Sequence, residues 1–168
     1  INYSHDAFEG FKDYLRNKYK TVEKLNKEWG LVYWSHELST WDDLWEPEGN
    51  AQPQYDIEWR RYQANLTDDL LKWQSNLIKS KIPSKQFVTV NLAMGRSALD
   101  EAKAGKSLDI ASSDIYYHMQ DGMKLPTPDE PHSWFLHGPW QIARDADRTY
   151  SIKQKPFNVA ETDGGPIG

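Results

Sequence analysis

Residues 87–117 read FVTVNLAMGRSALDEAKAGKSLDIASSDIYY, and this stretch decides the fold class. Its first residues, 87–90, are β-branched or aromatic and predict a short buried strand. A small helix is expected at 97–106 and a second strand at 108–117. Downstream, a helix at 141–152 precedes a third predicted strand at 156–160 (PFNVA). Strands that alternate with helices form parallel sheets through right-handed crossovers, so the sequence predicts an α/β fold, either doubly wound or a (β/α)8 barrel.

The first half of the chain is predicted to be mostly helical. A helix at 5–19 has one apolar face, and Thr21 caps a second short helix that Gly30 ends. Asp56 is expected to cap a long helix at 57–82, which Pro83 stops. Six residues at helical spacing form its predicted apolar stripe: Trp59, Tyr62, Leu66, Leu70, Trp73 and Leu77. The aromatic segment 31–55 between these helices lacks a sustained period, and we interpret it as a functional loop.

Composition removes several classes of function. The 168 residues carry a net charge of -5, and acidic and basic residues are mixed along the sequence. The sequence therefore has no basic run of the kind that binds nucleic acid. No apolar run reaches the roughly 20 residues that span a membrane. There is no cysteine, and the histidines lack metal-ligand spacing, so neither a metal nor a cofactor is expected. GxSxG, P-loop and GxGxxG motifs are also absent from the sequence.

Polar side chains follow the predicted strands. Asn91 follows the first strand, Asp114 and Tyr116 lie at the end of the second, and Glu161 follows the third. Functional groups of parallel α/β folds collect at the carboxyl ends of strands. A strand-end carboxylate more often caps a helix or forms an ion pair. For Glu161 that alternative is weaker, because Gly-Gly-Pro soon follows and disfavours a helix start.

Several segments together resemble the glycoside hydrolases of family 42, the bacterial β-galactosidases. They occur in the family's order: FKDYLRNKY at 11–19, LNKEWG at 25–30, YWS at 33–35, WDDL at 41–44, FVTVN at 87–91, LDIASSDIY at 108–116 and FNVAE at 157–161. The resemblance covers nearly the whole chain. It implies a (β/α)8 barrel of which residues 1–168 are one incomplete domain, containing the middle to later βα units.

The resemblance also implies site residues for a retaining glycosidase. Glu161 matches the nucleophile, Trp34 an aromatic residue of the galactose pocket, and Tyr116 a tyrosine close to the nucleophile. Asp114 and Asn91 are expected to hold sugar hydroxyls or to orient Glu161. The acid/base glutamate is expected upstream of Ile1, in a longer parent chain.

Some positions depart from the family pattern. Val90 replaces a common histidine and Ser113 a common tryptophan, and family members that bind zinc do so through cysteines that this sequence lacks. We interpret the first two changes as flanking the sugar subsite, which leaves a related β-glycosidase with another sugar preference as an alternative.

A carbohydrate-binding domain that uses the tryptophan-rich loop is a second alternative. The remaining expectations concern the parent protein and the isolated chain. We expect a carbohydrate substrate, no membrane or nucleic-acid partner, and a cytoplasmic bacterial location, with secretion and a homo-oligomeric parent enzyme left open. Half a barrel with one catalytic carboxylate is expected to be inactive alone.

Overall fold

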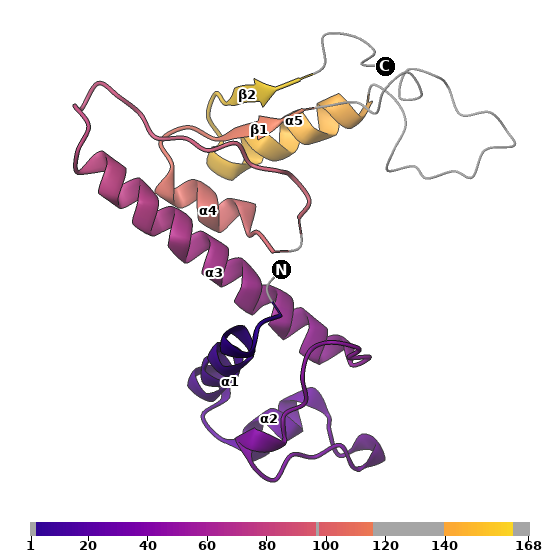
Figure 1. The fold of residues 1–168 in the computed structure, drawn as a ribbon. Coiled ribbons are helices and arrows are strands. Elements are labelled where there is room, and N and C mark those ends of the chain that lie inside the picture. The colour runs from indigo at the N-terminus through magenta and orange to yellow at the C-terminus, as the bar shows by residue number, and fades with distance from the viewer. Residues whose placement is uncertain (1–2, 97, 116–139, 163–168) are drawn as a thin grey trace, which may run out of the picture. The chain divides into compact units, whose positions relative to one another are not determined.

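The computed structural model describes residues 3–96, 98–115 and 140–162 (Figure 1). The chain divides into two compact units, Ile1–Thr67 and Asp68–Gly168, which are described separately below. Within the described ranges, no helix is both long enough and apolar enough to cross a membrane.

Unit 1 begins with the two helices that the sequence predicts. Helix α1 spans His5–Tyr19, and the Ser4 hydroxyl accepts a hydrogen bond from the Ala7 amide at its start. Helix α2 spans Val22–Trp29, with the Thr21 side chain capping its first turn. Gly30 ends α2 in the left-handed conformation (φ 68°), which a residue without a side chain adopts at no steric cost.

Aromatic side chains build the core of unit 1. The Phe11 ring, which is fully buried, lies 5.0 Å from the Trp59 ring and 5.3 Å from the Tyr55 ring, centroid to centroid. The Trp59 contact is edge-to-face and the Tyr55 contact is tilted, and both avoid the disfavoured face-to-face sandwich. In this unit most of the aromatic residues therefore serve packing.

The segment between α2 and α3 is ordered by polar contacts rather than by regular structure. It contains two short 3-10 turns, η1 at Tyr33–Ser35 and η2 at Trp41–Asp43. The buried Asn26 amide donates to the Leu38 carbonyl and accepts from the Leu38 amide, which fixes the middle of the segment. The predicted irregular structure of this segment is thus confirmed, and the segment is anchored at Leu38.

Helix α3 spans Pro53–Lys79. It begins before the predicted position, because Pro53 occupies a first-turn site that needs no amide hydrogen, so the prediction of Asp56 as its cap was wrong. It also ends at Lys79 rather than at Pro83.

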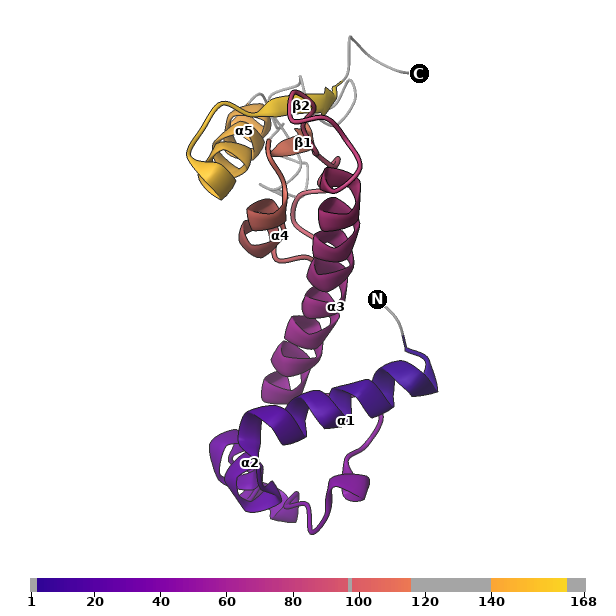
Figure 2. The same cartoon turned by 90° about the vertical axis from the view of Figure 1, so that its left-hand side faces the viewer.

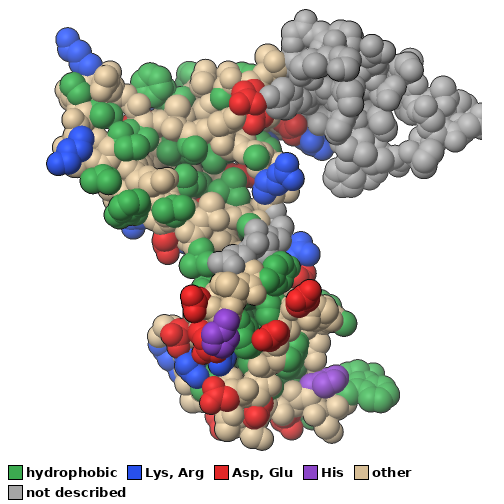
Figure 3. All heavy atoms as spheres, viewed as in Figure 1, with side chains coloured by type: hydrophobic (Ala, Val, Ile, Leu, Met, Phe, Trp, Pro, Cys, Tyr) green, Lys and Arg blue, Asp and Glu red, His purple; other side chains and the backbone are tan. Residues whose placement is uncertain are grey.

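The predicted apolar stripe of α3 is wrong over its second half. Trp59 and Tyr62 are buried, but Leu66, Leu70, Trp73 and Leu77 are 42–61 % exposed. The buried residues of that half include the polar side chains of Asp68 and Ser75. Ser75 is buried because its hydroxyl donates to the Ser107 carbonyl, next to the end of α4. Figure 3 shows the hydrophobic side chains that remain at the surface.

Unit 2 alternates helices with parallel strands, as the sequence predicts. Helix α4 spans Glu101–Ser107, β1 Ser112–Asp114, α5 Trp140–Lys153 and β2 Asn158–Glu161. Strands β1 and β2 pair in parallel, and Leu92 forms an isolated parallel bridge with Ser113 on the other side of β1. Three chain segments therefore run side by side in the order 92, β1, β2. Along the chain, α4 lies between Leu92 and β1, and α5 directly precedes β2.

The first predicted strand, 87–90, is not a strand in the structure. The segment runs beside residues 109–113, but side chains make several of the bonds that a ladder would use. The Asp109 carboxylate accepts from the Val88 amide, and the Thr89 hydroxyl donates to the Ile110 carbonyl. The regular bridge forms only at Leu92, two residues beyond the predicted strand.

Helices α4 and α5 lie close together on unit 2 (Figure 2). A Cβ atom on Gly105 would collide with the Ile152 side chain, so only glycine fits at this contact. The Lys153 ammonium group donates to the Gly105 and Leu108 carbonyls at 2.8 and 2.6 Å. These contacts fix the helix layer against which the parallel segments pack.

Candidate active site

The two faces of the parallel segments carry different side chains. Val88, Val90 and Leu92 pack with Ala104 and Leu108 in an apolar cluster on the helix side. Ser113, paired with Leu92, also faces the helices, because its hydroxyl lies 2.6 Å from the Thr149 hydroxyl of α5. Side chains alternate along an extended chain. The alternate residues therefore form the opposite face, called the polar face below: Asn91, Ser112, Asp114 and Asn158.

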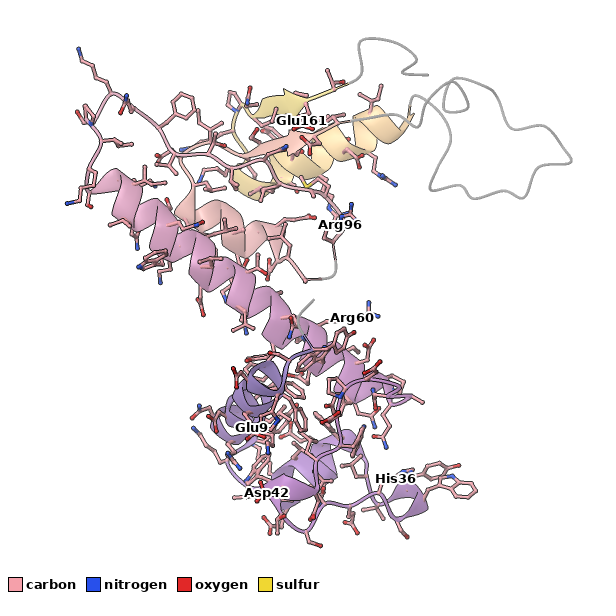
Figure 4. All side chains as sticks on the ribbon, in the orientation of Figure 1. Glu9, His36, Asp42, Arg60, Arg96 and Glu161 are labelled. Carbon is pink, nitrogen blue, oxygen red and sulfur yellow. The ribbon has the colours of Figure 1, made fainter. Side chains whose placement is uncertain are left out.

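Glu161 joins the polar face through an irregularity in β2. Ser112 pairs with Asn158 and Ser113 with Val159, but Asp114 pairs with Glu161 rather than with Ala160. One extra residue in a strand forms a bulge, which re-aims the side chains that follow it. A regular β2 would place Glu161 on the helix face with Val159. The bulge instead puts it opposite Asp114, at the carboxyl edge of the sheet (Figure 4).

The backbone holds this edge in place. The Ile115 amide donates to the Glu161 carbonyl at 2.9 Å, directly beyond the bulge. On the polar face, the Asn158 amide group donates to the Ser112 hydroxyl at 3.2 Å. The serine is 1 % exposed whereas Asn158 is exposed, so this bond connects the buried and the exposed part of the polar face.

Asp114 has a buried oxygen with an unfilled hydrogen-bonding capacity. Its Oδ1 atom is inaccessible to solvent and finds no donor among the residues that the structure describes. Leaving such an acceptor unpaired costs about 1–3 kcal/mol. Buried polar atoms normally have a partner, so this acceptor calls for a donor from outside the described residues.

Asn91 and Glu161 are both exposed at the edge where Asp114 is half-buried. Asn91 directly precedes Leu92, whose amide donates to the Ser112 carbonyl at 3.0 Å. Three of the five predicted site residues therefore lie on one face of adjacent segments. Their arrangement offers two carboxylates and an amide to a polar ligand.

The other two predicted site residues do not belong to the described part of unit 2. Tyr116 lies outside the described residues. Trp34 belongs to unit 1, where it is 75 % exposed beside the equally exposed Tyr33, and aromatic side chains project near His36 (Figure 4). Trp34 and Ser35 have φ values of 59° and 54°. A non-glycine residue in this conformation is uncommon, and such strain gathers at functional positions.

The structure changes the interpretation of two sequence departures. Val90 packs against the apolar cluster, and Ser113 is fully buried against α5. Both side chains lie on the helix face, on the opposite side of the segments from Asp114. Both side chains therefore pack toward the helices. The prediction that they flank the sugar subsite was wrong, because they lie on the other face of the segments.

Sequence reasoning missed two polar residues of this region. Ser112 and Asn158 support the polar face, yet the sequence pattern assigns each of them only to a predicted strand. The available signal for Ser112 was its position, two residues before the strand-end carboxylate Asp114. Within the described part of the chain, no group of three or more histidine, cysteine or acidic residues could hold a metal ion.

Comparison with known proteins shows the family. The family model of glycoside hydrolase 42, described as beta-galactosidase, matches residues 1–168. The chain belongs to this family.

Two curated relatives carry the name beta-galactosidase. The proteins of Clostridium cellulovorans and Lactobacillus acidophilus are each 30 % identical to this chain. Each alignment covers 95 % of this chain but 23 % of the relative. The chain thus spans about a quarter of the length of the curated family members that it matches.

Solved structures confirm the fold. The beta-galactosidase of the psychrophilic Marinomonas ef1 is 26 % identical and superposes with a TM-score of 0.82 over 99 % of this chain and 26 % of that one. The enzyme of the haloarchaeon Halorubrum lacusprofundi, at 23 % identity, gives a TM-score of 0.79 over 95 % of this chain and 24 % of that one. The chain is part of a (β/α)8 barrel, as the sequence predicts.

Proposed function

We propose that this chain supplies the nucleophile half of a retaining glycoside hydrolase that cleaves terminal β-D-galactosides. The observation that carries the proposal is the position of Glu161. It is a carboxylate at the carboxyl edge of a parallel sheet, turned by a bulge onto the face that bears Asp114. Membership of family 42 and relatives named beta-galactosidase support the reaction class and the sugar.

The mechanism follows from what retention requires. The Glu161 carboxylate attacks the anomeric carbon, and the bond to the leaving oxygen breaks as a glycosyl ester forms. A second carboxylic acid, about 5–5.5 Å from the first, protonates the leaving oxygen. It then takes a proton from water, which hydrolyses the ester with net retention. We assign that second group to a glutamate upstream of Ile1 in the parent protein.

The neighbouring residues would bind the sugar. The buried Oδ1 atom of Asp114 would accept a hydrogen bond from a sugar hydroxyl. The Asn91 side chain, on the adjacent segment, would offer amide donors and an acceptor. Trp34 would present a flat apolar face for stacking on the sugar ring, and Tyr116 would lie near Glu161 in the assembled site. Each of these roles is a binding or orienting one.

A direct test measures hydrolysis by the full-length protein that carries this chain. With p-nitrophenyl β-D-galactoside, glucoside and fucoside at equal concentration, the galactoside should have the highest kcat/KM. The first-formed sugar should be the β-anomer by NMR. An α-anomer would exclude the retaining mechanism, and a preference for glucoside would favour the alternative of another β-glycosidase.

Two further measurements distinguish a catalytic role from sugar binding alone. We expect the 168-residue polypeptide to show no turnover, because it offers one of the two carboxyl groups. In the full-length protein, Glu161→Gln should abolish hydrolysis while galactose binding persists. A binding domain without catalysis would instead give no hydrolysis even with Glu161 intact.

A further inference from the structure

Glu101, the first residue of α4, connects three separate segments of unit 2. Its Oε1 atom accepts a hydrogen bond from the Gly95 amide at 2.7 Å, and its Oε2 atom accepts one from Nε of Arg148 in α5 at 2.6 Å. The carboxylate side chain is 10 % exposed. Hydrogen bonds to a charged group are about twice as strong as neutral ones, so this bridge is a strong local constraint.

Helix capping does not explain Glu101. The preceding residue, Asp100, already caps α4, because its Oδ1 atom accepts from the Lys103 amide at 3.0 Å. Glu101 therefore contacts groups outside its own helix. Its partners are a loop amide before α4 and a guanidinium group 47 residues later.

Glu101 binds the loop of residues 92–95, which directly follows the proposed sugar-binding residue Asn91. At one end, the Leu92 amide donates to the Ser112 carbonyl and joins the segment to β1. At the other end, Gly95 turns the chain with φ 78° and directs its amide to Glu101. The two anchors hold the ends of residues 92–95, which directly follow Asn91, so the Glu101 contact limits how far the chain next to Asn91 can move.

The second anchor between α4 and α5 lies elsewhere. Lys153 connects α5 to the Gly105 and Leu108 carbonyls, at the carboxyl end of α4. Arg148 meets α4 at its first residue, on the side where the loop arrives. The two cations thus hold the same helix pair, but only the Arg148–Glu101 pair also holds the loop.

We propose that Glu101, oriented by Arg148, is a positioning residue that sets the place of Asn91 at the sugar site. This inference rests on the proposed function. It predicts that loss of the Glu101 carboxylate weakens sugar binding more than it slows the chemical step. Small displacements of a positioned group cost up to about a hundredfold in rate, so a loss of about tenfold in kcat/KM is expected.

The test compares Glu101→Ala, Glu101→Gln and Lys153→Met in the full-length protein. Glu101→Ala should raise KM for the galactoside about tenfold and leave kcat within about twofold, the pattern of lost ground-state binding. Glu101→Gln keeps an acceptor for the Gly95 amide and should recover much of the affinity. Lys153→Met loosens the same helix pair at its other end and should leave KM unchanged.

A second measurement needs no activity. In the full-length protein, hydrogen exchange of the Gly95 amide should be faster in Glu101→Ala than in the unaltered protein and unchanged in Lys153→Met. Equal exchange in all three would overturn the inference, as would equal KM values for Glu101→Ala and Lys153→Met. A full-length protein without galactosidase activity would instead refute the proposed function, and this inference with it.

Discussion

Asp114 lies opposite Glu161 in the parallel ladder because β2 carries one residue more than β1 between the paired positions. The bulge at Ala160 therefore does more than interrupt the sheet. It transfers the last side chain of β2 from the helix face to the polar face. The two carboxylates share this face at the carboxyl edge of the strands, where parallel α/β enzymes place their reacting groups.

The orphan oxygen of Asp114 gives the first prediction. Asp114→Asn in the full-length protein should lower kcat/KM for the galactoside by roughly 10- to 100-fold, the value of one hydrogen bond to a charged acceptor at about 1.5–3 kcal/mol. Because Oδ1 lacks a partner within the described ranges, the midpoint of thermal unfolding should hardly change. A wild-type kcat/KM in Asp114→Asn would contradict a role in sugar binding.

Asp68 predicts a pH-dependent stability. It is 3 % exposed, and its nearest cation is the Lys103 ammonium group at 3.8 Å. Burial raises the pKa of Asp68 to about 6, with Lys103 opposing the shift and Asp100 and Asp69 adding to it. An ordinary aspartate has a pKa near 3.9, so the folded chain binds the proton more tightly than the unfolded chain does.

This difference between the folded and the unfolded pKa determines how stability changes with pH. Asp68 should weaken the fold progressively as pH rises from about 4 to about 6, by at most roughly 3 kcal/mol. Asp68→Asn should remove this slope, which urea unfolding at pH 4.5 and pH 7 would measure. Asp69→Asn, the exposed neighbour, is the control and should keep the slope. Parallel pH profiles for the unaltered chain and Asp68→Asn would refute the assignment.

Glu58 is the opposite case, a buried carboxylate with partners for its charge. Its oxygens accept hydrogen bonds from Lys18 at 2.7 Å, from Arg61 at 2.6 Å and from the Tyr14 hydroxyl at 2.9 Å. Burial alone would raise the pKa of Glu58, but these hydrogen bonds outweigh it and lower the pKa.

Glu58→Gln should therefore destabilise unit 1 by about 1.5–3 kcal/mol at pH 7, because the buried side chain loses its charge-assisted hydrogen bonds from two more exposed cations. A group with a lowered pKa stabilises above its unfolded value, so the difference should shrink as pH falls below about 4. Asp13→Asn, which breaks the exposed pair with Arg16, should cost less than about 1 kcal/mol. Equal losses in the two variants would argue against the network.

Gly105 tests the contact between α4 and α5. Gly105→Ala should destabilise unit 2 by about 1–3 kcal/mol, although alanine favours helices, because its Cβ would overlap the Ile152 side chain. A β-branched side chain in a helix has little rotamer freedom to move away. In a double-mutant cycle, the cost should fall when Ile152 is also changed to Ala. Additive effects would show that the two positions do not meet.

The sequence predicted the helices of unit 1 and the order of elements in unit 2 because these depend on local patterns. The Thr21 hydroxyl and the conformational freedom of Gly30 bound α2. The β-branched run 87–90, in contrast, is not a strand, and β1 (Ser112–Asp114) contains no β-branched residue. The exposed half of α3 could not be predicted. Its spacing from Leu66 to Leu77 is that of a core helix, and only tertiary contacts reveal that Ser75 is buried instead.

Part of the candidate site was also predictable. Asn91, Asp114 and Glu161 could be predicted as site residues, because functional groups lie at strand ends. That the three side chains share one face could not be predicted. Counting by twos from Asn158 puts Ala160, not Glu161, beside Asp114, and nothing in the residues 156–161 marks a bulge. The hydrogen bond from the Gly95 amide to Glu101 likewise depends on how α4 packs after the loop. No short sequence motif predicts that packing.

The most direct test of the account is covalent trapping of the nucleophile. The full-length protein is incubated with a 2-deoxy-2-fluoro-β-D-galactoside that carries a good leaving group, digested, and mapped by mass spectrometry. The account predicts a single labelled peptide with the sugar on Glu161, and no label in Glu161→Gln. A label on any other residue would contradict the assignment of Glu161 as the nucleophile.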